Sequence, residues 1–410
     1  MSYLGELRRN VRPLVAASLG VGTSLPLFAY TNSIFAPHLI KAFGWSRAEF
    51  ALIGLTMLIM LPFLPIIGRW TDRFGVRRVA LIGSLLIMPG FIGYSLMGGN
   101  LYVYFALFTF VLIIGSMTGT LVYTRVVAES FTQARGLALT IVNCAPAAFA
   151  APLLPLLNML IEDIGWRMSY VLLGALCCIC GLIAVALVPK TSGQIVDPNA
   201  SSETVASPVE ATTRDDYRII LAAPLFWLIL IATFLCLLQT QLHSSQMNLM
   251  LIDQGLTTQT AANVASIYVL GTLIGRVACG LALDRFSTPL VTFFSMIIPA
   301  VGFAILGTSF DAFTVIAVAM FLVGLSVGAE TDIMPFIVAR YFKMRIYNTT
   351  LGLHMIAAFL ASAAGALGVS YTLARYDSFE PFLFVIAGSI VVGSTLFLLM
   401  PKARDYPKIG

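Results

Sequence analysis

The chain has 410 residues, of which 59% are apolar and 10% are charged, and its mean hydropathy is +0.93. Ordinary soluble domains carry about 25% charged residues, so this composition excludes a soluble enzyme, a disordered chain and a secreted disulfide scaffold. The apolar content suffices for about twelve membrane spans of about 20 residues each. A net charge of +5 could indicate nucleic-acid binding. The basic residues instead sort to one side of the membrane spans, as described below.

Twelve continuously apolar segments follow one another along the chain. Strands of a membrane β-barrel would alternate apolar and polar residues, and in lipid only a helix satisfies its backbone groups within one segment. We therefore predict an all-α membrane protein. Its spans are centred on residues 14–38, 49–67, 79–97, 101–124, 137–160, 168–188, 219–250, 260–282, 289–308, 312–337, 350–373 and 382–400. The first span is too long for a signal peptide and lacks a cleavage pattern, so we expect it to be retained.

The basic residues sort to one side of these spans. Of the 24 Lys and Arg residues, 19 fall at one set of span ends, four fall at the other, and Arg276 lies within a span. Because cytoplasmic loops carry the excess of Lys and Arg, both termini are predicted to be cytoplasmic. Contact with the lipid bilayer explains the basic clusters without any nucleic acid.

Residues 190–217 form the one long polar segment, rich in Ser, Thr, Pro and acidic residues. This composition predicts a flexible cytoplasmic linker between six-helix bundles at residues 1–189 and 218–410. The two halves resemble each other, because Gly68 and Asp72 after the second span recur as Gly280 and Asp284 after the eighth, 212 positions later. Duplicated halves of this kind place a substrate between them, near the middle of the membrane.

The loop after the second span reads Gly68-Arg69-Trp70-Thr71-Asp72-Arg73-Phe74-Gly75-Val76-Arg77-Arg78. This motif resembles the loop between helices 2 and 3 of the major facilitator superfamily. The resemblance implies twelve transmembrane helices in two six-helix bundles. It also implies a cytoplasmic conformational loop, with partners after the fourth span and a counterpart in the second half. The residues assigned to this role are Gly68, Asp72, Arg73, Gly75, Arg77, Glu129, Arg135, Asp284 and Arg285.

Further motifs resemble the monocarboxylate porter and oxalate/formate exchanger branches of that superfamily. They are Gly44-Trp45-Ser46-Arg47, Arg135-Gly136-Leu137-Ala138, Gly165-Trp166-Arg167 and Gly275-Arg276-Val277-Ala278-Cys279-Gly280-Leu281. In those branches an arginine of helix 8, four residues before a Gly-Leu pair, binds the substrate carboxylate. The resemblance therefore implies a carrier of organic anions with Arg276 as its anion-binding residue.

Arg276 also stands out on physical grounds. It precedes Asp284, at the predicted cytoplasmic end of its span, by eight residues, which is about 12 Å of helix. A charge at that depth costs several kcal/mol and indicates a function, and a guanidinium can hold a carboxylate through two parallel hydrogen bonds. Tyr268, Thr272 and Arg276 recur at i, i+4 and i+8, which places them on one helix face. The alternative role is a structural ion pair between helices.

The sequence leaves several candidates for the residue that binds the proton. Monocarboxylate porters resembling this chain carry an Asp where Thr272 stands, so the proton would bind elsewhere, or transport is not coupled to protons. Glu330 and Asp332, at similar depth in the tenth span, are the candidates, with a structural role as the alternative. An acid left unpaired when substrate occupies Arg276 would take up a proton. His354 is the third candidate; its neutral form would suit a monoanion and its protonated form a dianion.

Other polar residues within the spans are candidates for lining the pathway. The polar run from Gln239 to Gln246 in the seventh span indicates either a cavity lining or a gate that breaks the helix, with Gln239 and His243 on one face. Ordinary hydrogen bonding between helices is the alternative for each candidate in the first half. Those candidates are Tyr30, Asn32, Tyr123 and Asn143.

No catalytic constellation, cofactor motif or metal-ligand cluster is found in the sequence, and the six cysteines lie in apolar segments, where they act as small core residues. The leading hypothesis is a bacterial inner-membrane carrier that moves a small or aromatic monocarboxylate with a proton. The alternatives are an anion exchanger or dicarboxylate carrier of the oxalate/formate type, a drug or siderophore carrier, and a transporter-like sensor.

Overall fold

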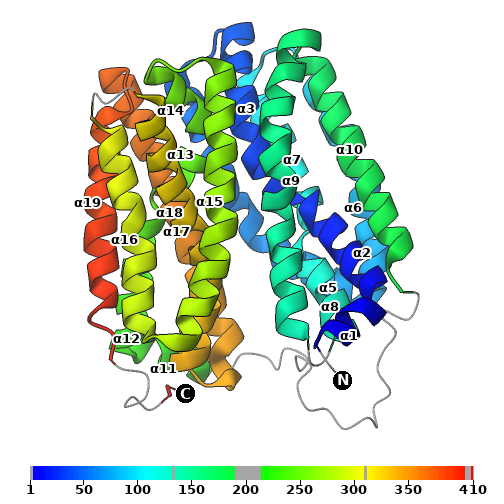
Figure 1. Cartoon of the computed structure of the whole chain (residues 1–410), viewed down its shortest axis with the longest axis vertical. Coiled ribbons are helices and arrows are strands. Elements are labelled where there is room, and N and C mark those ends of the chain that lie inside the picture. Colours follow the sequence, from blue (N-terminus) through cyan, green and yellow to red (C-terminus); the bar gives the residue numbers. More distant parts are fainter. Residues whose placement is uncertain (1–2, 132–133, 190–213, 309–311, 402–407, 410) are drawn as a thin grey trace.

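The computed structural model describes residues 3–131, 134–189, 214–308, 312–401 and 408–409, which fold into two groups of helices (Figure 1). The helices of the N-terminal half are α1 (Tyr3–Arg9), α2 (Val11–Gly22), α3 (Leu25–Phe43), α4 (Arg47–Ala51), the 3₁₀ helix η1 (Leu52–Ile59), α5 (Met60–Phe74), α6 (Val76–Leu96), α7 (Leu101–Ser116), α8 (Thr120–Ser130), α9 (Arg135–Ile164) and α10 (Trp166–Leu187). Those of the C-terminal half are α11 (Arg214–Ala222), α12 (Pro224–Leu237), α13 (Thr240–Ser244), α14 (Met247–Asp253), α15 (Thr258–Arg285), α16 (Thr288–Leu306), α17 (Phe313–Tyr341), α18 (Met344–Tyr376) and α19 (Glu380–Phe397).

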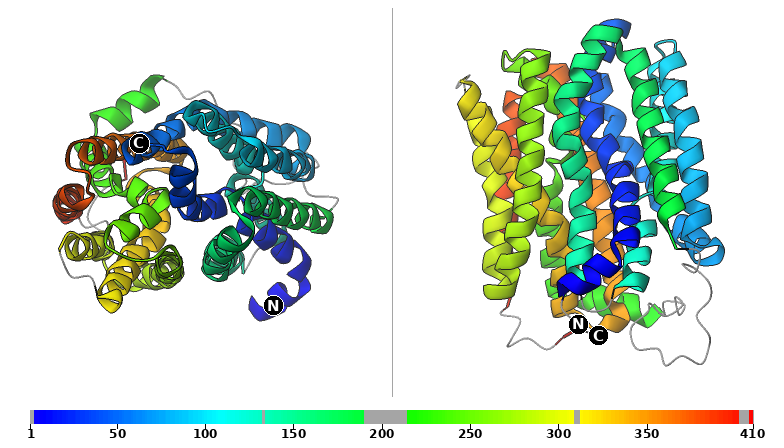
Figure 2. Two further views of the ribbon diagram at one scale, coloured as in Figure 1. Left: turned by 90° about the horizontal axis from the view of Figure 1, so that it is seen from above. Right: turned by 45° about the vertical axis from the view of Figure 1, so that its right-hand side comes forward.

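Eleven helices in the described part of the chain are long and apolar enough to cross a membrane. The number becomes twelve if the pair Asp216–Ala222 and Pro224–Leu237, bent by 73°, counts as one span. The N- and C-terminal ends lie at the same end of the molecule (Figures 1 and 2), as the charge pattern predicts; their cytoplasmic placement stays a prediction. Of the predicted linker, residues 190–213 lie outside the described residues, and residues 214–217 begin α11.

The seventh span is not the continuous helix that residues 219–250 predict. It consists of α12, α13 and α14, with breaks around Leu238 and Ser245. The hydroxyl of Thr240 donates to the carbonyl of Leu237 at 2.6 Å, and that of Ser245 donates to the side-chain oxygen of Gln241 at 2.8 Å. Such local bonds compete with the helical ladder, so the polar run interrupts the helix as the gate hypothesis requires.

Two spans of the N-terminal half are interrupted as well. The first breaks between α2 and α3, where Thr23 and Ser24 donate side-chain hydroxyls to the carbonyls of Leu19 and Val21, each at 2.8 Å. The fourth breaks between α7 and α8 at Met117–Gly119. The first, fourth and seventh spans therefore each contain a point where the helical hydrogen bonds are already interrupted. The backbone can bend there at a lower cost than in a continuous helix.

The helices α15 and α17 approach each other more closely than ordinary side chains allow. Gly271 and Gly275 of α15 face Gly324 and Gly328 of α17. A Cβ atom at Gly275 would overlap the carbonyl oxygen of Leu325, and one at Gly328 would overlap that of Thr272. Small residues four apart allow this contact in membrane helices. It fixes α15 against α17, with the backbone of Thr272 and Arg276 at the contact, while the hydroxyl of Thr272 faces Tyr30 and the guanidinium of Arg276 reaches Asn143.

Large apolar side chains cover the outer faces of both halves. Leu85 of α6, Ile179 of α10, Phe294 of α16 and Val385 of α19 are each more than half exposed. Exposed apolar surface of this extent is unusual on a soluble monomer, and lipid would cover it.

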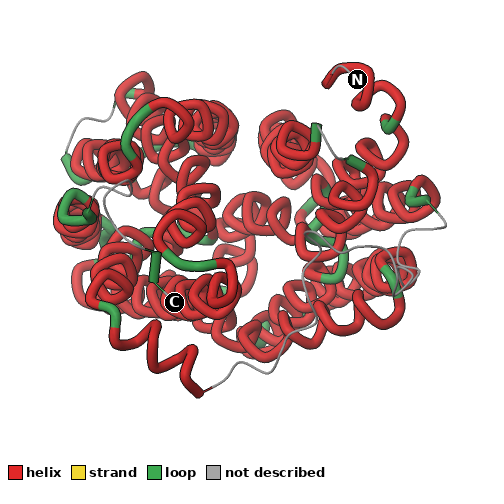
Figure 3. Tube along the Cα trace, turned by 90° about the horizontal axis from the view of Figure 1, so that it is seen from below, coloured by secondary structure: helices red, strands yellow, loops and turns green. Residues whose placement is uncertain are grey.

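The two halves meet along defined helices. The pairs in contact are α9 with α15, α3 with α13, α14 and α15, and α4 and η1 with α18. Seen from above and from below, the helices form two groups that touch near the centre (Figures 2 and 3). Polar residues carried on α3, α9, α13 and α15 are therefore brought together between the halves.

Candidate substrate site between the two halves

Arg276 links the two halves directly. Its guanidinium, half-buried on α15, donates a hydrogen bond from Nη1 to the backbone carbonyl of Asn143 on α9. Asn143 is itself half-buried, and Cys144 beside it lies close enough to Tyr30 for an electrostatic interaction. Asn143 thus meets the predicted anion-binding arginine, through its backbone oxygen.

Tyr30 of α3 reaches across to the same face of α15. Its hydroxyl lies 3.5 Å from the hydroxyl of Thr272, and Arg276 is near enough to interact with it electrostatically. Its ring packs edge-on against Tyr268, with centroids 6.3 Å apart. Tyr268 in turn stacks on the imidazole of His243 from α13, at 5.8 Å and 28°. The structure therefore brings together six of the predicted substrate residues, which we call the central cluster: Tyr30, Asn143, His243, Tyr268, Thr272 and Arg276.

Glu330 of α17 lies beside this cluster. It lies near enough to Tyr268 and to Cys236 of α12 for its charge to act on both groups. No ion pair joins Glu330 to Arg276 among the described residues, and the pairing of Arg276 with one of the two acids of the tenth span stays a prediction. The side chain of Asp332 lies outside the described residues.

His354 lies within the C-terminal half. It is 2% exposed on α18, its Nδ1 is 2.9 Å from the carbonyl oxygen of Thr350, and its ring packs edge-on against Phe226 of α12 at 5.2 Å. The structure thus places it in the packing between α18 and α12 and not in contact with the central cluster.

Asn32 and Tyr123 point into the N-terminal half. The side-chain oxygen of Asn32 accepts a hydrogen bond from the hydroxyl of Tyr104 at 2.8 Å, and Asn32 lines a small cavity of about 20 Å³ among aromatic rings. The ring of Tyr123 packs on Gly20 of α2, and its hydroxyl is buried. The structure does not bring either residue to the central cluster.

Gln239 is the remaining predicted pathway residue of the seventh span. It is 1% exposed at the junction of α12 and α13, and its side-chain oxygen has no hydrogen-bond partner among the described residues. Two residues further on, Gln241 donates to the hydroxyl of Ser362 at 2.7 Å and packs against Gly54 of η1. The broken seventh span thus lies in the seam between the halves.

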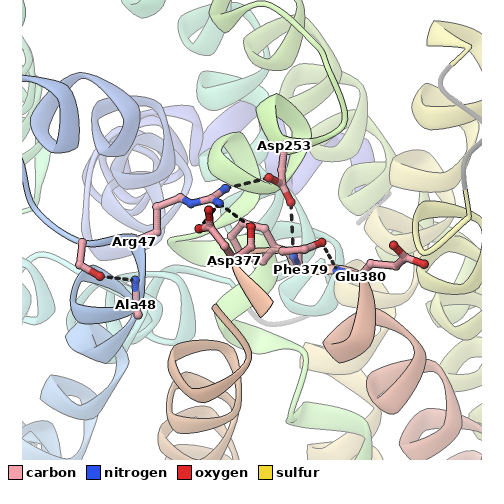
Figure 4. A network of polar contacts seen from close by, with 8 residues as sticks. Arg47, Ala48, Asp253, Asp377, Phe379 and Glu380 are labelled. Carbon is pink, nitrogen blue, oxygen red and sulfur yellow. Dashed lines mark hydrogen bonds and ion pairs between the residues drawn. The ribbon is translucent and has the colours of Figure 1, made fainter. Parts of the chain in front are cut away.

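A network of charges joins the halves at the end opposite the termini (Figure 4). Arg47, at the start of α4, contacts Asp253 at 2.8 Å and Asp377 at 2.6 Å. Asp253 also accepts the backbone N–H of Phe379 at 3.3 Å. We call Arg47, Asp253 and Asp377 the outer latch. This contact was not predicted from the sequence, and its three residues lie at the ends of the second, seventh and eleventh spans opposite the termini.

At the other end the described hydrogen bonds join each half to itself. In the N-terminal half the side-chain amide of Asn10 donates to the backbone carbonyl of Ser130 at 2.7 Å. In the C-terminal half the hydroxyl of Tyr341 donates to the backbone carbonyl of Pro401 at 2.7 Å. Among the described residues, the polar contacts between the halves lie across the centre and at the end opposite the termini.

The predicted conformational loop joins α5 to α6. Gly75 forms the turn with φ of +80°, a conformation that glycine adopts without strain. Arg73 is exposed, Arg77 is half-buried, and Arg285 is exposed at the end of α15; Gly68 lies in open space within α5. Glu129 contacts Arg125 at 3.0 Å. The side chains of Asp72, Arg135 and Asp284 lie outside the described residues, so their predicted pairing stays a prediction.

Known proteins place this arrangement in context. The pattern of the Major Facilitator Superfamily matches residues 17–366 and 229–409. The chain is 24% identical to the 4-hydroxybenzoate transporter PcaK of Pseudomonas putida over 395 residues, covering 87% of each protein. It is 24% identical to human monocarboxylate transporter 11 over 394 residues, covering 90% of this chain and 78% of that protein. With rat monocarboxylate transporter 4 the identity is 28% over 177 residues, covering 40% of this chain and 36% of that protein.

Solved transporter structures share the fold. A D-xylose–proton symporter superposes with a TM-score of 0.70 at 14% identity, covering 98% of this chain and 99% of that one. The nucleoside transporter NupG gives a TM-score of 0.73 at 14% identity, covering 96% and 99%. These matches confirm the predicted all-α membrane fold. The chain belongs to the Major Facilitator Superfamily, a family of secondary transporters and not of enzymes.

Proposed function

We propose that this chain is a proton-coupled carrier of small or aromatic monocarboxylates, which works by alternating access in the inner membrane of a bacterium. The names of the relatives support the substrate class, because they include monocarboxylate transporters and a 4-hydroxybenzoate transporter. The charge pattern of the spans supports cytoplasmic termini.

The position of Arg276 is the single observation that carries the proposal. A guanidinium at membrane depth is costly unless it has a use. This one stands at the contact between the halves, with Tyr30 and Thr272 beside it. A carboxylate is the ligand whose geometry matches its fork. A substrate bound there would take over the hydrogen bond that now goes to Asn143, so that binding would loosen a contact between the halves.

The proton belongs, in this proposal, on Glu330 or Asp332, with His354 as the alternative. Glu330 borders the central cluster through Tyr268, so a bound anion would lie near it and favour its protonated form. The loaded site is then close to neutral, so the halves can enclose the substrate and proton at a lower electrostatic cost. The packing of His354 against Phe226 favours a monoanion over a dianion, because it holds the second possible cation away from the cluster.

Uptake into proteoliposomes tests the proposal. The purified carrier, reconstituted without internal substrate, is given a panel of labelled aliphatic and aromatic monocarboxylates with and without an imposed inward proton gradient. We expect accumulation of at least one acid that depends on the gradient. Uptake that requires an internal counter-anion would instead identify an exchanger of the oxalate/formate type.

A further inference from the structure

We propose that the site selects carboxylates that carry a second hydrogen-bonding group about 6 Å from the carboxylate, a spacing we derive from Tyr268 and Arg276 below. Tyr268 and His243 would recognise that distal group, and Arg276 would hold the carboxylate. A para-hydroxylated aromatic acid has this form. The inference rests on the carboxylate-carrier function proposed above and adds to it which carboxylates are preferred and which residues decide.

The hydroxyl of Tyr268 and the Nδ1 atom of His243, at one end of the central cluster, have no hydrogen-bond partner among the described residues. Tyr268 is 0% exposed, and its hydroxyl has no hydrogen-bond partner among the described residues. The Nδ1 atom of His243 is also buried without a described partner, and the two rings are stacked at 5.8 Å. Buried polar groups in native proteins are nearly always satisfied. Because both atoms border the face of α15 that carries Arg276, a ligand held by Arg276 would supply the partner.

The spacing along α15 sets the length of that ligand. Tyr268 and Arg276 are eight residues apart on one helix, which is about 12 Å of rise. Both side chains lean toward the N-terminus of the helix, so their polar ends keep about this offset. Subtracting two hydrogen bonds of about 3 Å each leaves about 6 Å between the two polar groups of the ligand. A benzene ring substituted at its para positions spans such a distance, whereas a 2-hydroxy acid does not.

The aromatic rings of the central cluster suit a flat ligand. The rings of Tyr30, Tyr268 and His243 follow one another at centroid distances of 6.3 and 5.8 Å, and aromatic rings pack well on one another. A phenolic hydroxyl both donates and accepts a hydrogen bond. It can therefore satisfy the hydroxyl of Tyr268 and the Nδ1 atom of His243 together, one as donor and the other as acceptor.

Binding calorimetry with matched ligands tests the inference. Benzoate, 2-hydroxybenzoate and 4-hydroxybenzoate are titrated into the detergent-purified full chain, its Tyr268→Phe and His243→Phe variants, and a Tyr170→Phe control. Tyr170 is also a buried tyrosine, but it stacks on Phe35 inside the N-terminal half. We expect the wild type and Tyr170→Phe to bind 4-hydroxybenzoate about tenfold more tightly than the other two acids. Tyr268→Phe should lose most of this preference, measured as the ratio of the affinities for 4-hydroxybenzoate and benzoate within the same variant.

The outcomes separate this inference from the function on which it rests. If the wild type binds benzoate and 4-hydroxybenzoate equally, and Arg276→Lys weakens both, the carboxylate site stands and the distal selection is wrong. A preference that survives in both Tyr268→Phe and His243→Phe also contradicts it. If none of the acids binds the wild type, the proposed function fails together with the inference. His243→Phe provides the second measurement if Tyr268→Phe shows no cooperative thermal unfolding.

Discussion

At the scale of single residues, Arg276 combines two roles that are usually separate. It is the residue best suited to bind a carboxylate, and it donates to a backbone carbonyl of the opposite half. An anion that competes for the guanidinium therefore competes with a contact between the halves. This competition provides a physical link between substrate binding and the movement that alternating access requires.

Replacing Arg276 with Lys keeps the positive charge and removes the two-pronged hydrogen-bonding geometry. We expect the affinity for the preferred carboxylate to fall by about 10- to 150-fold, since a hydrogen bond to a charged group contributes about 1.5–3 kcal/mol. The measurement is binding calorimetry, with thermal unfolding to establish that the variant folds. Wild-type affinity in a folded variant would remove Arg276 from the site.

Neutral replacements of Glu330, Asp332 and His354 show which of these three groups carries the proton. The amide in Glu330→Gln or Asp332→Asn imitates the protonated acid, so the variant of the true proton carrier should lose pH-driven accumulation and keep exchange of labelled for unlabelled substrate. His354→Gln serves as the comparison, because its ring packs on Phe226. Both activities are measured in the same proteoliposome preparation. Normal accumulation in all three variants would show that none of these groups couples transport to protons.

At the scale of helices, the close contact of α15 and α17 fixes the anion-binding face. Gly275→Ala should lower the melting temperature and weaken carboxylate binding, because the new methyl group meets the carbonyl of Leu325. Gly280→Ala is the matched control on the same helix, since a Cβ there meets nothing within 4 Å. Alanine otherwise favours a helix over glycine by about 1 kcal/mol, so the control should be neutral or stabilising. Equal melting temperatures for the two variants would argue against a tight α15–α17 contact.

At the scale of the whole molecule, the outer latch stabilises the arrangement in which the halves are joined at the end opposite the termini. Arg47→Gln removes both ion pairs with Asp253 and Asp377. Partly exposed pairs are individually weak, so we expect a several-fold shift toward the outward-open state. Hydrogen–deuterium exchange of residues 47–51 and 247–253 should become faster.

Arg375→Gln is the control for the latch, because Arg375 is an exposed arginine at the same end. Exchanging the charges in Arg47→Asp with Asp253→Arg should restore part of the slow exchange. If exchange is the same in Arg47→Gln and the wild type, the latch has no influence on the conformational equilibrium.

Much of this organisation follows from the sequence, and the reasons for the remainder are physical. Continuous apolar runs and the placement of basic residues predict the spans and the shared end of the termini. Helical periodicity places Tyr268, Thr272 and Arg276 on one face. The breaks in the seventh span could not be located from hydropathy, because apolar residues continue through them. The orientation of Asn32 toward its own half could not be predicted, because both faces of the first span look alike in sequence.

The outer latch lay beyond sequence reasoning for another reason. Arg47 is separated by 206 positions from Asp253 and by 330 from Asp377. No local pattern links such distant residues, and each alone looks like a solvated charge at a span end.

The coupling of carboxylate movement to protons through Arg276 is tested most directly by the internal pH of reconstituted vesicles. The wild type and Arg276→Lys are reconstituted with a trapped pH-sensitive dye and no internal substrate, and 4-hydroxybenzoate or a short monocarboxylate is added outside. Protein-free vesicles correct for acid that crosses the lipid unaided. We predict that the interior of wild-type vesicles acidifies in step with uptake and that, at the same substrate concentration, Arg276→Lys vesicles acidify much more slowly, close to the protein-free rate. Substrate uptake without acidification, or equal acidification by Arg276→Lys and the wild type, would contradict this mechanism.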